Sequence, residues 1–123
     1  MRGDNNNFTI LPSAVRAAAS NSQDQFNLDG RGLILVLDIT VVPGVDTITP
    51  TIQGKDPASG KYFTILAGAA QVGVATVILR VYPGLVVAAN LAANDILPVI
   101  WRLAMVHSAG SNFTYSVGAS IVL

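Results

Sequence analysis

The final segment of the chain, SNFTYSVGASIVL (residues 111–123), decides the fold class. Mostly apolar side chains stand at every second position, and small polar residues or glycine stand between them. The first set is Phe113, Tyr115, Val117, Ala119, Ile121 and Leu123, and the second is Thr114, Ser116, Gly118 and Ser120. A period of two places successive side chains on opposite faces of an extended backbone. We therefore expect a half-buried β-strand that continues to the last residue.

Further upstream segments have the same character, because Val, Ile, Thr and aromatic residues recur in short runs between Gly, Pro, Asn and Asp. The chain has no Glu and little Lys, the residues that usually cover exposed helix faces. The expected strands are residues 33–42, 47–53, 61–66, 74–81, 99–107 and 112–123. Their spacing predicts an all-β fold, a single antiparallel β-sandwich that is jelly-roll-like.

Turn residues separate these strands. Pro43 and Gly44 suit a turn between antiparallel neighbours, because proline presets φ and glycine accepts a positive φ. Residues 54–60, GKDPASG, predict a hairpin loop between two alternating segments. Residues 90–98 are interpreted as a connection that crosses from one sheet to the other.

The amino-terminal region is divided into two parts. Residues 1–10 are expected to be an extended N-terminal arm, polar at its start, and residues 11–123 the β-sandwich domain. The alanine-rich residues 12–21 fit either a short helix or an extended edge segment. The all-β context favours the extended alternative.

Composition limits the partners and the chemistry. The chain of 123 residues is long enough for one domain, and it has no cysteine for disulfides or thiolate chemistry. The seven basic residues, Lys and Arg together, balance the seven Asp. Only 11% of residues are charged, and the mean hydropathy is +0.54. Such a sparsely charged surface indicates that other subunits cover part of it.

Several partner classes are not expected. The few basic residues form no cluster that could neutralise a row of phosphates, so nucleic acid is a poor candidate. No run approaches the roughly 18–20 apolar residues of a membrane helix, and the polar N-terminus does not resemble a signal peptide.

Two ionisable residues, Asp38 and His107, are candidates for a catalytic site. Asp38 interrupts an apolar strand, so we expect either a buried carboxylate in a structural ion pair with Arg80 or Arg102, or an exposed position on one face of the strand. His107, the only histidine, ends a strand and is interpreted as a turn-facing or capping residue. Neither has the neighbours that acid-base or nucleophilic catalysis needs, so we expect no enzyme, no cofactor and no metal.

Four phrases carry a resemblance to a known group of proteins. They are residues 52–63, residues 82–85, residues 93–98 followed by Trp101 and Arg102, and residues 115–120. Together they resemble small structural proteins of tailed bacteriophages and prophages, over about residues 30–123. The resemblance implies a virion component and, for a compact chain of this size, a capsid decoration (cement or auxiliary) protein on the outside of the head. Its implied partners are the major capsid protein and copies of itself, with a trimer preferred and synthesis in the bacterial host cytoplasm.

The expected contact residues lie on the arm and on the loops at residues 54–60 and 85–95. They are Arg2, Asn5, Phe8, Ile10, Lys55, Asp56, Leu85, Asn90, Asn94 and Asp95. The alternative is a carbohydrate-binding or adhesion module of a head fibre or tail. Its sugar-stacking residues would come from Tyr62, Phe63, Tyr82, Trp101, Phe113 and Tyr115.

Overall fold

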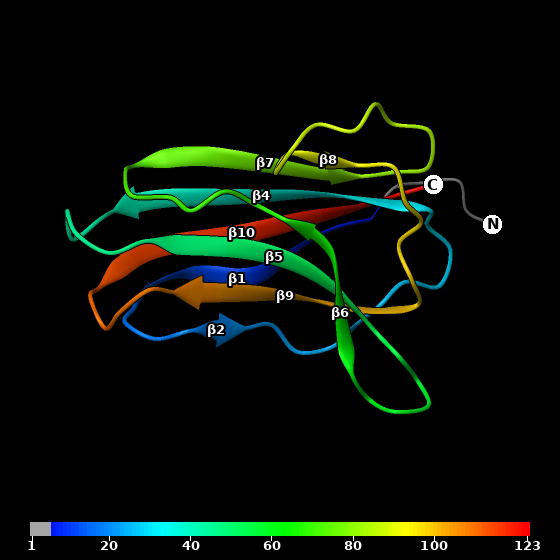
Figure 1. The fold of residues 1–123 in the computed structure, drawn as a ribbon, viewed down its shortest axis with the longest axis horizontal. Helices are drawn as coiled ribbons and strands as arrows, with labels where there is room; N and C mark the ends of the chain where they lie inside the picture. The colour runs from blue at the N-terminus through cyan, green and yellow to red at the C-terminus, as the bar shows by residue number, and fades with distance from the viewer. Residues whose placement is uncertain (1–5) are drawn as a thin grey trace.

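The computed structural model of the protein describes residues 6–123, which form two layers of β-strands (Figure 1). The first layer, the β4 sheet, has the order β1 (Asn6–Arg16), β10 (Phe113–Val122), β4 (Gly32–Val41), β7 (Ala75–Val81) and β8 (Ala92–Ala93). The second layer, the β5 sheet, has the order β2 (Ser20–Asn21), β9 (Ile100–His107), β5 (Ile48–Lys55) and β6 (Tyr62–Ala67), with β3 (Gln25–Phe26) also paired to β9. All pairings are antiparallel except that of β7 with the short β8. The predicted all-β antiparallel sandwich is confirmed.

The sequence predicts six of the seven longer strands, but not the two-residue strands β2, β3 and β8, and it predicts β1 only in part, as an extended segment. The expected ranges match β4, β5, β6, β7, β9 and β10 to within two residues at each end. Residues 12–21 are extended where the chain forms β1 and β2, so the extended alternative is confirmed. No helix long and apolar enough to cross a membrane occurs in the part of the chain that the structure describes.

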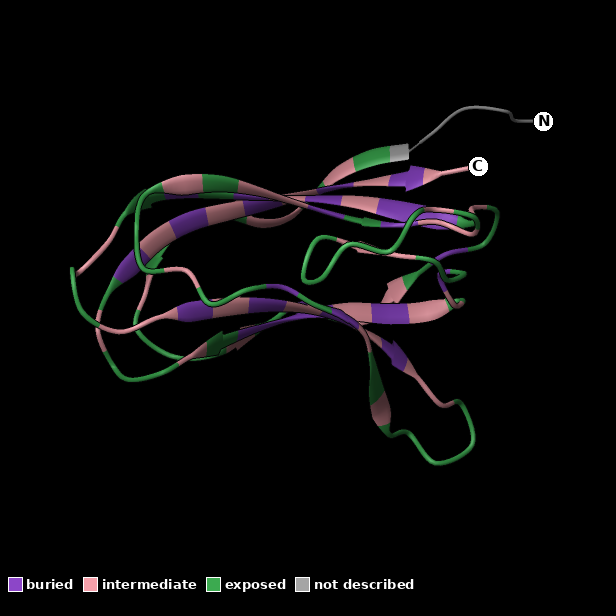
Figure 2. Ribbon diagram, turned by 45° about the horizontal axis from the view of Figure 1, so that its top comes forward, coloured by how far each residue is buried: buried purple, intermediate pink, exposed green. Residues whose placement is uncertain are grey.

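The hydrophobic core lies between the two sheets. β10 alternates buried and half-buried residues along its whole length, and its buried side chains share the core with inward residues of β4 in the same sheet and of β9 in the opposite sheet (Figure 2). Trp101, Tyr115 and Phe113 are the largest fully buried side chains. Burying one large apolar side chain contributes about 1.5–3 kcal/mol relative to leaving it exposed, so this core is the main stabilising feature of the fold.

The predicted arm is partly a strand of the sandwich. Residues 6–10 belong to β1, where Asn7 pairs with Ser120 and Phe8 with Ala119. The half-buried Phe8 packs on the core, its ring centroid 6.4 Å from that of Trp101. The arm therefore does not extend to residue 10, because β10 of the same chain pairs with this segment. Residues 1–5 lie outside the described part.

Of the two alternatives for Asp38, the exposed position is confirmed. Leu37 and Ile39 point into the core, so alternation turns Asp38 outward, where it is exposed and accepts a hydrogen bond from the Thr76 hydroxyl at 3.3 Å. Neither Arg80 nor Arg102 forms an ion pair with it in residues 6–123. The carboxylate remains hydrated, so it needs no buried counter-charge.

Candidate interaction surfaces

The β5–β6 hairpin projects beyond the two layers of the sandwich (Figure 1 and Figure 2). At its tip, the Asp56 carboxylate accepts hydrogen bonds from the Ala58 amide at 3.0 Å and from the Ser59 hydroxyl at 2.7 Å. These bonds, the Ser59 hydroxyl first, lower the pKa of Asp56. The backbone amide of Gly60, at φ +75°, closes the turn onto the Asp56 carbonyl at 2.8 Å. The hairpin prediction is confirmed, and Asp56 shapes its loop.

A polar cluster joins the base of this hairpin to the segment between β2 and β3. The Asp24 carboxylate pairs with Lys55 Nζ at 2.8 Å and accepts a hydrogen bond from the Tyr62 hydroxyl at 2.5 Å. Arg102 lies over the Tyr62 ring, 3.5 Å from its centroid, and its Nε donates to the Gln53 amide oxygen at 2.8 Å. Lys55 and then Tyr62 lower the pKa of Asp24. The polar groups satisfy one another, so the cluster holds the hairpin in place.

The sequence does not predict this cluster. Asp24 and Lys55 are 31 positions apart, and Asp24 and Tyr62 are 38 apart. No local pattern links residues at such separations. The proximity follows only from sheet pairing, because β2 and β3, which flank Asp24, pair with β9, and β9 and β6 both pair with β5.

The connection from β7 to β9, residues 82–99, crosses from the β4 sheet to the β5 sheet as predicted (Figure 1). Three predicted contact residues stabilise it by hydrogen bonds. Asn94 accepts from the Gly84 amide at 2.7 Å, Asn90 donates to the Ala67 carbonyl at 3.0 Å, and Asp95 accepts from the Ile96 amide at 2.8 Å. Leu85 is half-buried and lines an apolar hollow of about 180 Å³ beside β4 and β7.

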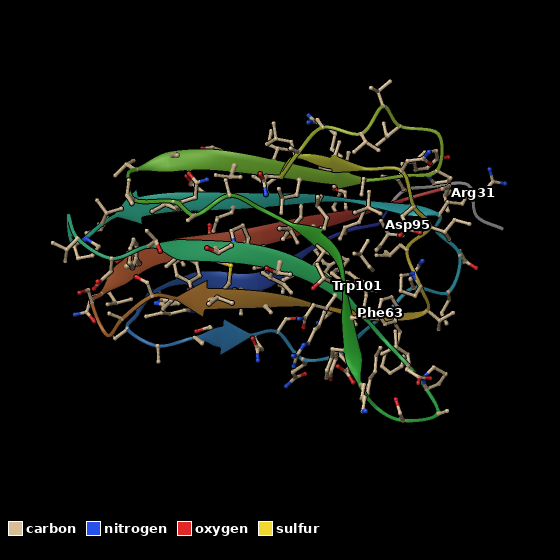
Figure 3. All side chains as sticks on the ribbon, in the orientation of Figure 1. Arg31, Phe63, Asp95 and Trp101 are labelled. Carbon is tan, nitrogen blue, oxygen red and sulfur yellow. The ribbon has the colours of Figure 1, made fainter. Side chains whose placement is uncertain are left out.

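Exposed apolar side chains concentrate on this connection and on the adjoining turn after β3. Val86 is 89% exposed and Leu28 is 82% exposed. The other exposed large apolar residues of these two segments are Phe26, Val87, Leu91, Ile96 and Val99. The buried Asn27 holds the two segments together, since its side-chain amide donates to the carbonyls of Gly30 and Leu97. We call residues 26–31 and 82–99 the crossover end; Arg31 and Asp95 mark it in Figure 3.

The remaining predicted contacts divide into two groups. Phe8 and Ile10 are half-buried and pack against the core, so their side chains mainly serve the fold. Arg2 and Asn5 lie outside the described residues. Lys55 is bound to Asp24 at the base of the hairpin. The structure thus brings the loop residues 85–95 together, but it places them far from the hairpin tip (Figure 1).

His107 is not turn-facing. It is half-buried, its Nε2 lies 2.9 Å from the Tyr115 hydroxyl, and its ring packs edge-on against Phe113. Burial, and then the nearby Arg16, lower the pKa of His107. The side chain therefore links β9 of one sheet to β10 of the other in its neutral form.

Comparison with known proteins adds no family. No protein-family model matches the chain, and neither the curated proteins nor the solved structures contain a match. Among residues 6–123, no group of three or more His, Cys, Asp or Glu side chains could hold a metal ion. The feature that stands out in the described part is the exposed apolar crossover end.

Proposed function

We propose that this chain is a structural protein of a tailed-bacteriophage virion, a capsid decoration protein that binds the outer head surface. Made in the host cytoplasm, it contacts the major capsid protein and copies of itself, with a trimer as the favoured assembly. It stabilises the lattice mechanically, without catalysis or a cofactor. The observation that carries the proposal is the crossover end, where Val86 and Ile96 are 89% and 62% exposed on a chain with only 11% charged residues.

The order of the strands supports a viral structural role. Leaving aside the short β8, the chain alternates between sheets in a pattern that gives the orders β1-β10-β4-β7 and β2/β3-β9-β5-β6. We assign this pattern to a jelly roll, the double-sheet architecture that recurs in viral capsid domains and in lectins. Fold alone does not assign a role, so the exposed surface has to decide between these two uses.

Burial of the crossover end supplies the binding energy in this proposal. Apolar surface removed from water contributes about 25 cal/mol per Å², less the cost of association and of ordering side chains. One copy would bind modestly. Many linked copies on a repeating lattice would bind much more tightly, because each further contact forms at a high effective concentration.

The test is co-sedimentation with purified phage heads that lack this gene product. Val86→Asp combined with Ile96→Asp places charge on the crossover end, and we expect a loss of binding of about tenfold or more. The control is Val45→Asp, a change at a valine that is 64% exposed, about as accessible as Ile96, in the turn between β4 and β5. Wild-type protein that fails to bind procapsids and expanded heads contradicts the proposal, as does a double variant that binds like wild type.

The alternative of a carbohydrate-binding module keeps little aromatic surface. Trp101, Phe113 and Tyr115 are buried, and Arg102 covers the Tyr62 ring. Among the described residues the exposed aromatic side chains are Phe26 and Phe63, at 67% and 50%; Phe63 lies on β6 of the projecting hairpin (Figure 3). Binding on a glycan array that Phe63→Ala abolishes, together with no affinity for heads, is the result that would favour the alternative.

A further inference from the structure

The outer face of the β4 sheet is a weakly charged surface. The register aligns three rows of outward side chains across the strands. They are Asn7, Ser120, Ile34 and Arg80; Thr9, Gly118, Val36 and Ile78; and Ser116, Asp38 and Thr76. Because Gly118 has no side chain, a shallow hollow of about 400 Å³ lies in the middle row, lined in part by Thr9, Val36 and Ser120.

This face carries one positively charged and one negatively charged side chain that can still form an ion pair with another molecule. In β1, β10, β4 and β7 the charged residues are Arg16, Asp38 and Arg80. The Arg16 guanidinium is already bonded to backbone carbonyls, including that of Tyr115 at 2.7 Å. Asp38 accepts a hydrogen bond only from the Thr76 hydroxyl, and the exposed Arg80 guanidinium has no hydrogen bond or ion pair within residues 6–123.

The two charges are too far apart to pair within one molecule. Asp38 pairs in register with Thr76, and Arg80 pairs with Ile34. They therefore lie on neighbouring strands, separated by four residues or about 13 Å along the strand direction. Midway between them lies the register pair of Val36 and Ile78, whose side chains also point outward.

This arrangement is self-complementary. A two-fold axis that lies in the plane of the face, between Val36 and Ile78 and across the strands, turns a second copy face to face with the first. Asp38 of each copy then stands over Arg80 of the other, and the apolar pair at the centre packs on its own counterpart. The line from Asp38 to Arg80 spans four residues along the strands and one strand spacing across them, so it runs about 20° off the strand direction. The two-fold axis doubles this angle, so the strands of the two copies cross at about 40°, near the roughly 30° of aligned sheet packing.

We propose that a second copy of this chain docks on the outer face of the β4 sheet, with two reciprocal Asp38–Arg80 ion pairs around a Val36–Ile78 centre. The four strands cover about 500 Å² of face, below the roughly 800 Å² per partner of a standard interface, so the contact is a reversible one. Its symmetry builds dimers. The trimer expected from sequence would need a different surface, and the inference does not depend on binding to a capsid.

The test is sedimentation velocity over a range of protein concentrations at low salt. In a dimer of Asp38→Arg or of Arg80→Asp, both reciprocal ion pairs become pairs of like charges. We expect each variant to weaken dimerisation about tenfold or more. The double variant with both changes restores opposite charges, so its dissociation constant returns to near the wild-type value. Lys61→Asp, an exposed change on the remote hairpin loop, is the control and leaves dimerisation unaltered.

The outcomes separate this contact from other assemblies. Wild-type protein that stays monomeric at every concentration overturns the proposal, as does an oligomer whose affinity neither single variant changes. Two weakened single variants without recovery in the double variant also overturn it, since charge pairing between copies predicts recovery. If a reversal variant unfolds, Asp38→Asn and Arg80→Gln replace it, each with a smaller loss and no recovery when combined.

Discussion

Gly32 at the start of β4 offers a sharp test of how closely this sheet is packed. A β-carbon built at this position would lie 2.2 Å from the Val81 carbonyl oxygen and 2.5 Å from Cδ1 of Tyr82. The first of these is a backbone atom of the neighbouring strand, so it cannot rotate away as a flexible side chain would. Gly32→Ala must therefore push β4 and β7 apart locally.

Overpacking of this kind costs about 1–3 kcal/mol. For 123 residues the entropy of unfolding is about 0.26 kcal/mol per kelvin, so the melting temperature of Gly32→Ala is expected to fall by about 4–12 °C. The assay is thermal unfolding followed by the fluorescence of Trp101, the single and fully buried tryptophan.

Gly73→Ala is the matched control, because a β-carbon there meets nothing within 4 Å and no positive φ disfavours it. We expect its stability to change by no more than about 0.5 kcal/mol. The reasoning is refuted if Gly32→Ala melts at the wild-type temperature, or if Gly73→Ala is destabilised as much as Gly32→Ala.

Two further predictions address the core and its histidine. Leu35→Ala, at a fully buried position of β4, is expected to cost about 2–5 kcal/mol in urea unfolding, whereas Val41→Ala, 56% exposed on the same strand, costs less than about 0.5 kcal/mol; equal losses would contradict the assigned faces. Burial lowers the pKa of His107 in the folded protein below its ordinary 6.5, so the unfolded chain takes up a proton first as the pH falls. The His107 contribution to stability is therefore complete above pH 6.5 and is lost progressively below it. Between about pH 8 and about pH 5, the melting temperature is expected to fall less in His107→Gln than in the wild-type protein. An equal fall in the two proteins would argue against a lowered pKa of His107.

Much of the architecture is predictable because apolar and polar residues alternate along each long strand, and this pattern is local. Every second residue of β10 and β4 is buried, and the period of two in the sequence predicts this directly. The short β2, β3 and β8 have only two residues each, too few to show a period. The sequence predicts an arm over part of β1 because polar residues precede its apolar ones, and because its partner β10 is the last strand of the chain.

The interaction surfaces depended on contacts that no local pattern contains. Alternation predicts that Asp38 and Leu37 face opposite ways, but it does not say which face another sheet covers, so it leaves both a buried ion pair and an exposed position open for Asp38. The Asp24–Lys55 pair and the shared face of Asp38 and Arg80 arise from pairing between strands distant in the chain. The sequence by itself determined the class of secondary structure, because side-chain periodicity is a local property; only the tertiary structure decided which charges stand near each other, because that depends on which strands become neighbours.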